Sequence, residues 1–391
     1  MDFTGIIAEY DPFHNGHAAQ LAAVRAAGAQ CIAVCMSSGA VQRGGVPILP
    51  ESVRVRAALD AGADLVVALP APYACATAEQ FAAAGVHLLA ALGCDTLAFG
   101  AETPDAAALL DTARLLDGEE LNARIRQNLA TGMTYAAARA AAADALHPGT
   151  GGLLRTPNNI LGIEYCKALL GQNAPLRPVT IRREGSAHDG ALAPDTHPSA
   201  SGLRALLRQG KREEALSLLP PAMARAYELE EAAGRAPVFW ENSHRAILAR
   251  LRSMTAADFA ALDQGREGIW NRLYDASRAA ASLPELLAAA KTKRYAMARL
   301  RRMVLWAYLG LTPGDMPERV PYLRVLAANG TGCRLLSRMR EAAAVPVLTK
   351  PADVSLLGAE AEALFAVESR CTDLYVLARP DPAQMTPGPG A

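Results

Sequence analysis

Through the first half of the chain, short apolar segments alternate with stretches of helical character. Segments over residues 5–8, 31–36, 65–69 and 96–99 have the length and composition of buried strands. Helical patterns follow the first three of them, over residues 17–27, 51–61 and 79–92. Such alternation requires right-handed crossovers between parallel strands. It therefore predicts an α/β fold built on a doubly wound parallel sheet.

The first of these strands leads into the tetrad His14-Asn15-Gly16-His17, directly before a helical pattern. A helix start attracts anions, because its backbone N–H groups are unpaired and its dipole is positive there. Gly16 lets the backbone approach phosphate oxygens, since it has no Cβ. His14 and His17 share a face of the first turn and could stabilise charge developing on a phosphoryl group. The junction thus predicts attack on the α-phosphate of a nucleoside triphosphate; packing, surface and metal-binding roles for the histidines are the alternatives.

The composition argues against several classes of protein. The 391 residues carry no net charge, which argues against a basic coat for nucleic acid but allows a segregated basic face. The seven cysteines form no CxxC pair, so buried reduced thiols are expected. No secretory segment and no apolar span of membrane length is recognisable. Together these features predict a soluble cytoplasmic protein without a membrane association.

The later part of the chain has a mostly helical pattern in place of the alternation of strands and helices. A helical pattern covers residues 119–147, a strand is expected over 179–183 and a polar loop over 184–200. Residues 201–340 are nearly all helical in pattern, followed by a short strand over 345–348 and a helix over 360–377. We therefore predict a catalytic nucleotide-binding domain over residues 1–209 and a second, mainly helical domain over 210–378. The proline-rich tail over 379–391 is expected to be disordered.

Several polar residues stand where a nucleotide could be bound. The arginine pair Arg182-Arg183 ends a strand; alternation lets only one of them face the site, and we favour Arg182. Asn158 and Asn159 precede a helix, where one of them could be only an N-cap. Between residues 291 and 302 a basic segment contains no acidic residue. Such a segment is typical of phosphate neutralisation, or simply of a solvated helix face.

The tetrad resembles the HxGH signature of the nucleotidylyltransferase superfamily, which includes class I tRNA synthetases. The turn Ser199-Ala200-Ser201-Gly202-Leu203-Arg204 resembles that superfamily's second signature, although an ordinary Ser N-cap has the same pattern. Further motifs lie at residues 36–37, 41–44, 61–70, 99–102, 156–165, 291–295 and 321–326. In order and spacing, these motifs are similar to those of the bacterial tRNA(Met) cytidine acetate ligases, over nearly the whole chain.

The resemblance implies a Rossmann-like nucleotidyltransferase fold with ATP as a substrate. Acetate would be activated as acetyl-adenylate and transferred to N4 of the wobble cytidine of elongator tRNA(Met), with release of pyrophosphate and AMP. Mg²⁺ commonly accompanies ATP in such chemistry, although no carboxylate cage for a metal is recognisable. The oligomeric state is left open.

The expected site follows from the same resemblance, with His14 and His17 as the catalytic residues. The expected ATP contacts are Ile7, Ala8, Glu9, Tyr10, Phe13, His14, Gly16, His17, Gly100, Asn159, Arg182, Ser199, Ser201 and Arg204. The expected tRNA contacts are Lys291, Lys293, Arg294, Arg299, Arg301 and Arg302.

Three segments depart from the family pattern. Asp11 replaces an Asn and places an extra carboxylate near the phosphates, unless a basic side chain balances it. Residues 38–40 replace Gly-Asn-Phe, and residues 48–52 replace a run that carries Asp-Lys-Trp. Two other functions therefore stay open: a small-molecule adenylyl- or cytidylyltransferase of the same superfamily, and a non-catalytic RNA-binding protein with a degenerate nucleotide site.

Overall fold

The structure is a computed structural model that describes residues 3–183, 199–263, 268–293, 295–339 and 343–384. Most of the loop expected over residues 184–200 lies outside these ranges, as do Arg294 and most of the tail expected over residues 379–391.

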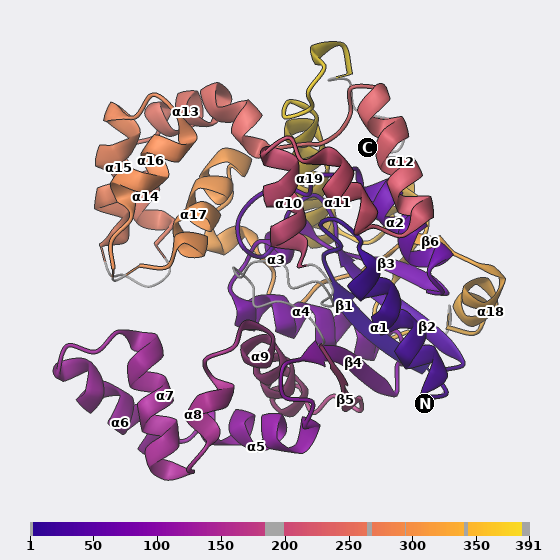
Figure 1. The fold of residues 1–391 in the computed structure, drawn as a ribbon, viewed down its shortest axis with the longest axis horizontal. Helices are drawn as coiled ribbons and strands as arrows, with labels where there is room; N and C mark the ends of the chain where they lie inside the picture. Colours follow the sequence, from indigo (N-terminus) through magenta and orange to yellow (C-terminus); the bar gives the residue numbers. More distant parts are fainter. Residues whose placement is uncertain (1–2, 184–198, 264–267, 294, 340–342, 385–391) are drawn as a thin grey trace.

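A mixed sheet forms the centre of the molecule (Figure 1). Its strands are β1 (Phe3–Ala8), β2 (Cys31–Ser37), β3 (Leu65–Leu69), β4 (Thr96–Ala101), β5 (Arg177–Arg182), β6 (Leu323–Ala328) and β7 (Val347–Leu348). Within the described residues the sheet has seven strands in the order β5-β4-β1-β2-β3-β6-β7. Strands β1 to β5 run parallel, and β6 pairs antiparallel with β3. The predicted α/β fold with a doubly wound sheet is confirmed.

Helices cover both faces of the sheet. In the first half they are α1 (Asn15–Ala26), α2 (Glu51–Asp60), α3 (Ala71–Ala74), α4 (Ala78–Ala91), α5 (Ala106–Leu116), α6 (Glu119–Ala130), α7 (Tyr135–Leu146), α8 (Thr150–Leu153) and α9 (Pro157–Gly171). Successive strand residues point to opposite faces, so neighbours such as Ile6 and Ile7 enter different hydrophobic clusters. The Ile6 cluster includes Leu21 of α1, whereas the Ile7 cluster includes Phe81 of α4.

The second half is mostly helical. Its α-helices are α10 (Ala200–Arg208), α11 (Arg212–Ser217), α12 (Pro221–Ala232), α13 (His244–Ser253), α14 (Ala256–Ala261), α15 (Ile269–Ala279), α16 (Leu283–Ala290), α17 (Met297–Leu309), α18 (Gly330–Met339) and α19 (Ala359–Val376). Short 3₁₀ turns are η1 (Trp240–Ser243), η2 (Pro313–Asp315), η3 (Pro351–Leu356) and η4 (Pro382–Gln384).

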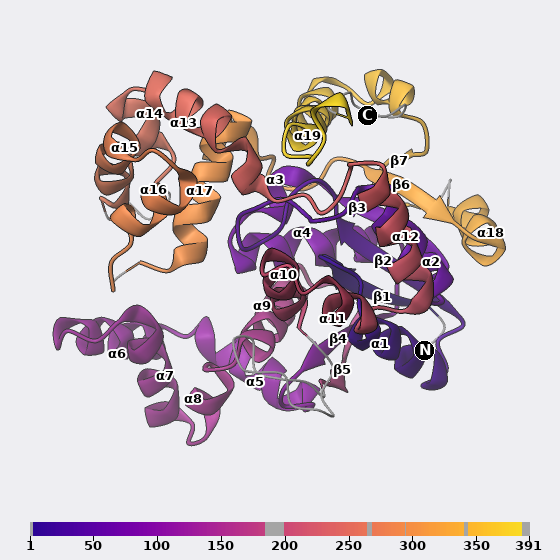
Figure 2. The same cartoon turned by 45° about the horizontal axis from the view of Figure 1, so that its top comes forward.

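Two helical groups stand out from the sheet on the same side of the molecule. Figures 1 and 2 both show α13–α17 as one group and α6–α8 as a second group that projects below it. Helices α13–α17 bury a hydrophobic cluster of their own, with Trp306 and Phe259 among its members. The cluster also includes Cys75 of the segment after α3, so this group is packed onto the sheet-containing part.

Two local predictions differ from the structure. The single helix expected over residues 119–147 is broken into α6 and α7, with Gly132 at a φ of 89° between them. Strand β6 lies where helix was expected, because its residues pair with β3 and extend the sheet. The predicted domain boundary at residues 209 and 210 stays a prediction; Leu206 and Leu216, on either side of it, share one hydrophobic cluster.

Helix length and polarity also bear on membranes. Across the described ranges, no helix combines the length and the apolar character that a membrane span requires.

Candidate nucleotide site

The two histidines of the tetrad cap the start of α1 reciprocally. His14 is the N-cap residue, and its Nδ1 accepts a hydrogen bond from the backbone N–H of Gly16 at 3.1 Å. His17 Nδ1 accepts in turn from the backbone N–H of His14 at 3.3 Å. The two rings stack, with centroids 3.7 Å apart and an interplanar angle of 22°. This arrangement is a capping box in which imidazoles take the usual places of Ser or Thr and Glu or Gln.

The caps fix the tautomer of both rings. A nitrogen that accepts a hydrogen bond carries no proton, so the hydrogen bonds assign the proton of each neutral ring to Nε2. Burial lowers the pKa of His17 well below its ordinary value, and the nearby His14 and Arg183 lower it further. His17 is therefore neutral at pH 7 and acts as a hydrogen-bond donor through Nε2 rather than as a cation.

Aromatic side chains hold His17 in place. The Tyr10 ring packs edge-on at a centroid distance of 4.9 Å, and the Phe13 ring lies at 5.6 Å. Both belong to the turn between β1 and α1, where Tyr10 adopts a φ of 51°. Tyr10 and Phe13, both predicted at this junction, therefore pack against the histidine pair.

Asp11 is balanced by a basic side chain. Its carboxylate is buried, and Oδ1 accepts a hydrogen bond from the backbone N–H of Ile48 at 2.7 Å. The guanidinium of Arg204 lies 3.1 Å from Oδ2 and also donates to the Asp11 carbonyl oxygen. The extra carboxylate is thus part of an ion pair that ties α10 to the β1–α1 turn. Arg204, expected at the phosphates, is placed beside this turn but is already engaged.

The serines before α10 serve as its cap. Ser199 is the N-cap residue, and its Oγ accepts from the backbone N–H of Gly202 at 3.1 Å. The hydroxyls of Ser199 and Ser201 are also hydrogen-bonded, at 3.1 Å. The start of α10 therefore has the geometry of an ordinary Ser N-cap, and it is brought near the histidine turn through Arg204.

The opposite side of the site is built on Glu102 at the end of β4. Its carboxylate accepts hydrogen bonds from the backbone N–H groups of Asn158 and Asn159, at 3.2 and 2.8 Å, and so caps α9. Burial opposes ionisation of Glu102, but these hydrogen bonds and that of the Asn158 amide outweigh it and lower its pKa. Asn159 is buried. Its Oδ1 accepts a hydrogen bond from the backbone N–H of Thr103 at 3.0 Å, and its Nδ2 donates to the Thr103 hydroxyl at 3.1 Å.

Arg183, rather than Arg182, lies on the side of the histidines. Its guanidinium donates to Asn158 Oδ1 at 3.1 Å, and its charge contributes to the lowered pKa of His17. Gly100 lies beside it, and an added Cβ there would stand 4.0 Å from the Arg183 side chain, which is ordinary van der Waals contact. Arg182 is exposed, because successive residues of an extended strand point in opposite directions. The ATP contact assigned to Arg182 stays a prediction, and the geometry favours Arg183.

Arg54 is a site-building residue that sequence reasoning missed. Its guanidinium is fully buried and donates to the carbonyl oxygens of Glu9 at 2.9 Å, Ser37 at 2.7 Å and Ser38. It thereby ties together the carboxyl ends of β1 and β2, where ligands of parallel sheets bind. A signal was present in the sequence: Arg54 shares a helix face with the buried Ala57 and Ala58.

Glu9 contributes a second carboxylate at the end of β1. Its Oε1 accepts from the backbone N–H of Gln42 at 2.6 Å. Burial raises the pKa of Glu9 and the nearby Asp11 adds to the rise, although the Gln42 hydrogen bond, Arg204 and Arg43 oppose it. The loop after β2 is thus fixed to the end of β1.

The basic segment near α17 does not form one stripe. Helix α16 ends at Ala290 and α17 begins only at Met297, so the spacing of four between Lys291, Tyr295 and Arg299 falls on no single helix. Lys291 Nζ donates to the carbonyl of Tyr295 at 2.7 Å, and the Tyr295 ring is buried.

The arginines of α17 itself face different partners. Arg299 pairs with Asp263 at 2.7 Å, and Arg302 donates to the carbonyl of Gln42 at 3.2 Å. Lys293 is exposed, and Arg294 lies outside the described residues. Some basic side chains of this segment therefore make internal contacts, whereas Arg302 contacts the loop beside the nucleotide site.

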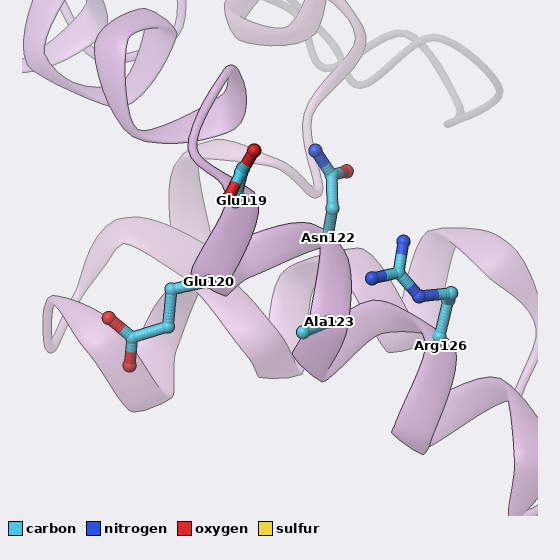
Figure 3. A pocket seen from close by; sticks show the side chains of 5 residues that line it. All are labelled: Glu119, Glu120, Asn122, Ala123 and Arg126. Carbon is cyan, nitrogen blue, oxygen red and sulfur yellow. The ribbon is translucent and has the colours of Figure 1, made fainter.

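A hollow elsewhere on the surface does not compete with this site. It lies on α6 and is lined by Glu119, Glu120, Asn122, Ala123 and Arg126 (Figure 3). Figures 1 and 2 place α6 in the projecting group, away from the start of α1. Metal ligands are not gathered either: the described residues contain no group of three or more His, Cys, Asp and Glu side chains placed to hold an ion.

The sheet, the histidine-capped helix start and the surrounding arginines define a nucleotidyltransferase-type protein. Residues 1–387 match the family model described as HIGH Nucleotidyl Transferase. The tRNA(Met) cytidine acetate ligase of Syntrophotalea carbinolica is 37% identical, with 89% of this chain and 85% of that protein covered. The chain belongs to the tRNA(Met) cytidine acetate ligase family.

Solved structures agree with this placement. The crystal structure of Thermotoga maritima TmcAL in its apo form I is 26% identical, with a TM-score of 0.93 over 99% of this chain and 97% of that chain. The same protein bound with alpha-thio ATP, in form II, matches with a TM-score of 0.89 at the same identity and coverage.

Proposed function

We propose that this protein is an ATP-dependent ligase that activates acetate and acetylates N4 of the wobble cytidine of elongator tRNA(Met). The reciprocal histidine cap at the start of α1 carries the proposal. It fixes two imidazoles, each accepting a backbone hydrogen bond at Nδ1, at a helix start that attracts phosphate. Membership of the tRNA(Met) cytidine acetate ligase family and the alpha-thio ATP complex of the Thermotoga maritima protein support ATP as the nucleotide.

The reaction has two steps. An acetate oxygen attacks the α-phosphorus of ATP, and the bond to the β-phosphate breaks with release of pyrophosphate. N4 of the cytidine then attacks the carbonyl carbon of acetyl-adenylate, loses a proton and displaces AMP. In the first step, His14 and His17 donate hydrogen bonds to oxygens of the transferring phosphoryl group, where negative charge develops. The rings can do so through Nε2–H, because Nδ1 of each ring accepts a hydrogen bond from the backbone.

Other residues orient the nucleotide. Arg183 is the cation best placed for the phosphates, because it neighbours His17 and its guanidinium is held by Asn158. Arg204 orders the turn through Asp11 and adds positive charge beside it. Gly100 leaves room for the nucleoside, while Asn159 shapes the pocket wall through Thr103. Ile7, Ala8, Glu9, Tyr10, Phe13 and Gly16 complete the proposed pocket with Ser199 and Ser201.

Mg²⁺ enters the proposal only as a companion of ATP. Magnesium is usually bound by one or two carboxylates together with substrate phosphates. Of the nearby carboxylates, Asp11 is engaged by Arg204, Glu102 by the start of α9 and Glu9 by the backbone N–H of Gln42. The described residues therefore do not fit a preformed metal site. The side chains named above act on the phosphates directly.

Acceptor binding is assigned to the later, mainly helical part of the chain. The proposal keeps the division into residues 1–209 for ATP chemistry and 210–378 for tRNA. Lys291, Lys293, Arg294, Arg299, Arg301 and Arg302 are the proposed tRNA contacts. An enzyme that modifies tRNA in bacteria would work in the cytoplasm.

The decisive experiment is an acetylation assay. The protein is incubated with ATP, acetate and unmodified elongator tRNA(Met), and digested nucleosides are analysed by mass spectrometry. We expect N4-acetylcytidine that depends on all three substrates. Pyrophosphate release with a phosphorylated small molecule in the absence of RNA would instead favour a metabolite nucleotidyltransferase. Tight tRNA binding without ATP turnover would favour a non-catalytic RNA-binding protein.

A further inference from the structure

The helical group α13–α17 is strongly basic. Residues 244–309 contain 12 Lys and Arg but only 5 Asp and Glu, in a chain whose net charge is zero. Among the described residues of this group one ion pair forms, between Arg299 and Asp263. By contrast, Arg212 of α11 alone has three Glu side chains within ion-pair distance. Carboxylates therefore leave most of the positive charge of the group without neutralisation.

Two arginines form a reciprocal pair where α13 and α15 end. Arg252, near the end of α13, donates from Nε to the carbonyl oxygen of Ser277 at 3.0 Å and from Nη2 to that of Ala280 at 2.8 Å. Arg278, near the end of α15, donates to the carbonyl oxygens of Arg252 and of Met254, the latter at 2.5 Å. Each guanidinium group thus caps the carboxyl end of the other arginine's helix.

The pair keeps positive charge and unused donors. The carboxyl end of a helix carries about half a negative charge, so each guanidinium group is only partly neutralised by its cap. Neither Arg252 nor Arg278 forms an ion pair with a described carboxylate, and both side chains are exposed. Nη1 of Arg252 and Nε of Arg278 donate to no acceptor among the described residues, because the caps use the other nitrogens. The pair therefore presents about one net positive charge and free N–H groups to solvent.

The carboxylates of the group do not neutralise this pair. Asp258 and Glu285 accept hydrogen bonds at the starts of α14 and α16, and Asp263 is taken by α17. Glu267 lies outside the described residues. Asp275 is exposed on α15, one turn before the second arginine of the pair, and forms no ion pair with a described residue. Its charge is close enough along the helix to weaken the attraction of the pair for an anion.

Packing holds the pair in place. The guanidinium carbon of Arg278 lies 4.4 Å from the centroid of the Tyr274 ring. Tyr274 packs edge-on against the buried ring of Phe259, at a centroid distance of 5.5 Å. Donors fixed in this way lose little conformational entropy when an anion binds.

We propose that Arg252 and Arg278 bind phosphate groups of the acceptor tRNA backbone. The planar fork of a guanidinium group matches the oxygens of a phosphate. This inference rests on the proposed function, because it takes the acceptor to be RNA. It adds a phosphate contact outside residues 291–302, the segment to which that proposal assigns tRNA. Backbone contacts carry no sequence information, so the pair contributes to affinity and not to the choice of tRNA(Met).

The test compares charge variants of the full-length protein. Affinity for unmodified elongator tRNA(Met) is measured by filter binding over a series of KCl concentrations. Arg252→Gln and Arg278→Gln should each weaken binding about fivefold and lower the slope of log K against log salt by about 0.7–0.9, the loss of one phosphate contact. An unrelated tRNA should lose affinity by the same factor. Arg225→Gln removes an equal charge at an exposed position of α12 and should change neither quantity.

Two further variants separate charge from helix capping. Arg278→Lys keeps the positive charge but loses the two-pronged cap, and it should retain the salt slope of the unaltered protein. Asp275→Asn removes the exposed carboxylate of α15 and should tighten tRNA binding about twofold. A purely structural role of the arginines would not produce tighter binding. Thermal unfolding of each variant verifies that the proteins compared are folded.

Other outcomes overturn the inference. Arg252→Gln and Arg278→Gln with the affinity and salt slope of the Arg225 control would do so. Equal loss of slope in Arg278→Lys and Arg278→Gln would mean that the arginine acts only as a helix cap. Weaker binding of elongator tRNA(Met) alone would mean base recognition in place of a backbone contact.

A separate measurement tests the proposed function itself. Acetate-dependent exchange of pyrophosphate into ATP requires no tRNA, so the variants of the pair should keep the exchange rate of the unaltered protein. Absence of exchange in the unaltered protein would reject acetate activation, while the binding series would still decide the role of Arg252 and Arg278.

Discussion

The β1–α1 turn and the basic segment of α17 were both recognised from charged or polar residue types, yet they differ in how the structure uses those residues. In the turn, His14 and His17 contact backbone groups within three residues of themselves. In α17, Arg299 meets Asp263 and Arg302 meets Gln42, which is 260 residues away. Local partners let a short motif specify its own geometry, whereas distant partners decide whether a charge is available to a ligand.

The largest effect is expected at the histidine pair. His14→Asn keeps an N-cap acceptor and His17→Gln keeps the capping-box partner, but both lose the imidazole ring and its N–H aimed at the phosphoryl group. If the rings stabilise the phosphoryl group, each variant should lower the rate of acetyl-adenylate formation by roughly 10²–10³-fold. Exchange of labelled pyrophosphate into ATP with acetate measures this rate.

A control separates chemistry from helix capping. His147→Ala changes an exposed histidine at the end of α7 and should retain full activity. Binding of tRNA by the His14 and His17 variants should also be retained. If His14→Asn and His17→Gln keep the rate of the unaltered protein, the histidines serve only as caps, and the proposed role of this turn in phosphoryl transfer is wrong.

The next effect distinguishes two adjacent arginines that carry the same charge. Arg183→Gln should raise the KM for ATP about 10- to 100-fold, because a charge-assisted contact to phosphate is lost. Arg182→Gln should have little effect, because that side chain is exposed. Steady-state exchange kinetics at varied ATP concentration measure both. The reverse order would favour the assignment that the sequence gives to Arg182.

The same contrast between local and distant partners explains which parts of the fold could be predicted from the sequence. Strands β1 to β4 were predicted because buried parallel strands are continuous apolar runs. Strand β6 was missed because Leu, Arg and Ala are good helix formers, and only pairing with β3 makes the segment extended. The break at Gly132 was missed because helix-forming residues continue on both sides of it, with an alanine-rich pattern after it.

In the site, too, features with local partners were predicted and features with distant partners were missed. The histidine pair at the start of α1 lies within four consecutive residues and was recognised from them, although its capping hydrogen bonds were not predicted. The partner of Asp11 was not, because Arg204 lies 193 residues later in the chain. Arg54 was overlooked because an arginine is normally solvated, and its acceptors are carbonyl groups that carry no sequence signature. Only the assembled sheet shows which backbone carbonyl oxygens lack a partner within the strands, so the acceptors of Arg54 could not be identified from the sequence.

A smaller effect tests whether Arg299 is a structural or an RNA-binding residue. Asp263 is buried, so Arg299→Gln leaves its carboxylate without an ion pair and should lower the free energy of unfolding by about 1–2 kcal/mol. Lys293→Gln, at an exposed position, should change stability by less than about 0.5 kcal/mol. Urea unfolding measures both. A stable Arg299→Gln variant whose tRNA binding has a reduced dependence on salt would instead support the tRNA contact proposed for Arg299.

The smallest effect concerns the charge state of His17. Burial lowers its pKa in the folded protein, whereas in the unfolded chain the ring titrates at its ordinary value of 6.5. Below pH 6.5 the unfolded state therefore binds a proton that the folded state does not, so stability is lost as pH falls. Above pH 6.5 both states are neutral at this ring and its contribution is constant. The difference in unfolding free energy between the unaltered protein and His17→Gln should thus be flat above pH 6.5 and decrease below it. Taking the difference removes the titration of carboxyl groups common to both proteins. A difference that grows in favour of the unaltered protein on acidification would mean that folding raises the pKa of His17, and the ring would then act as a cation like the arginines around it rather than as a neutral donor.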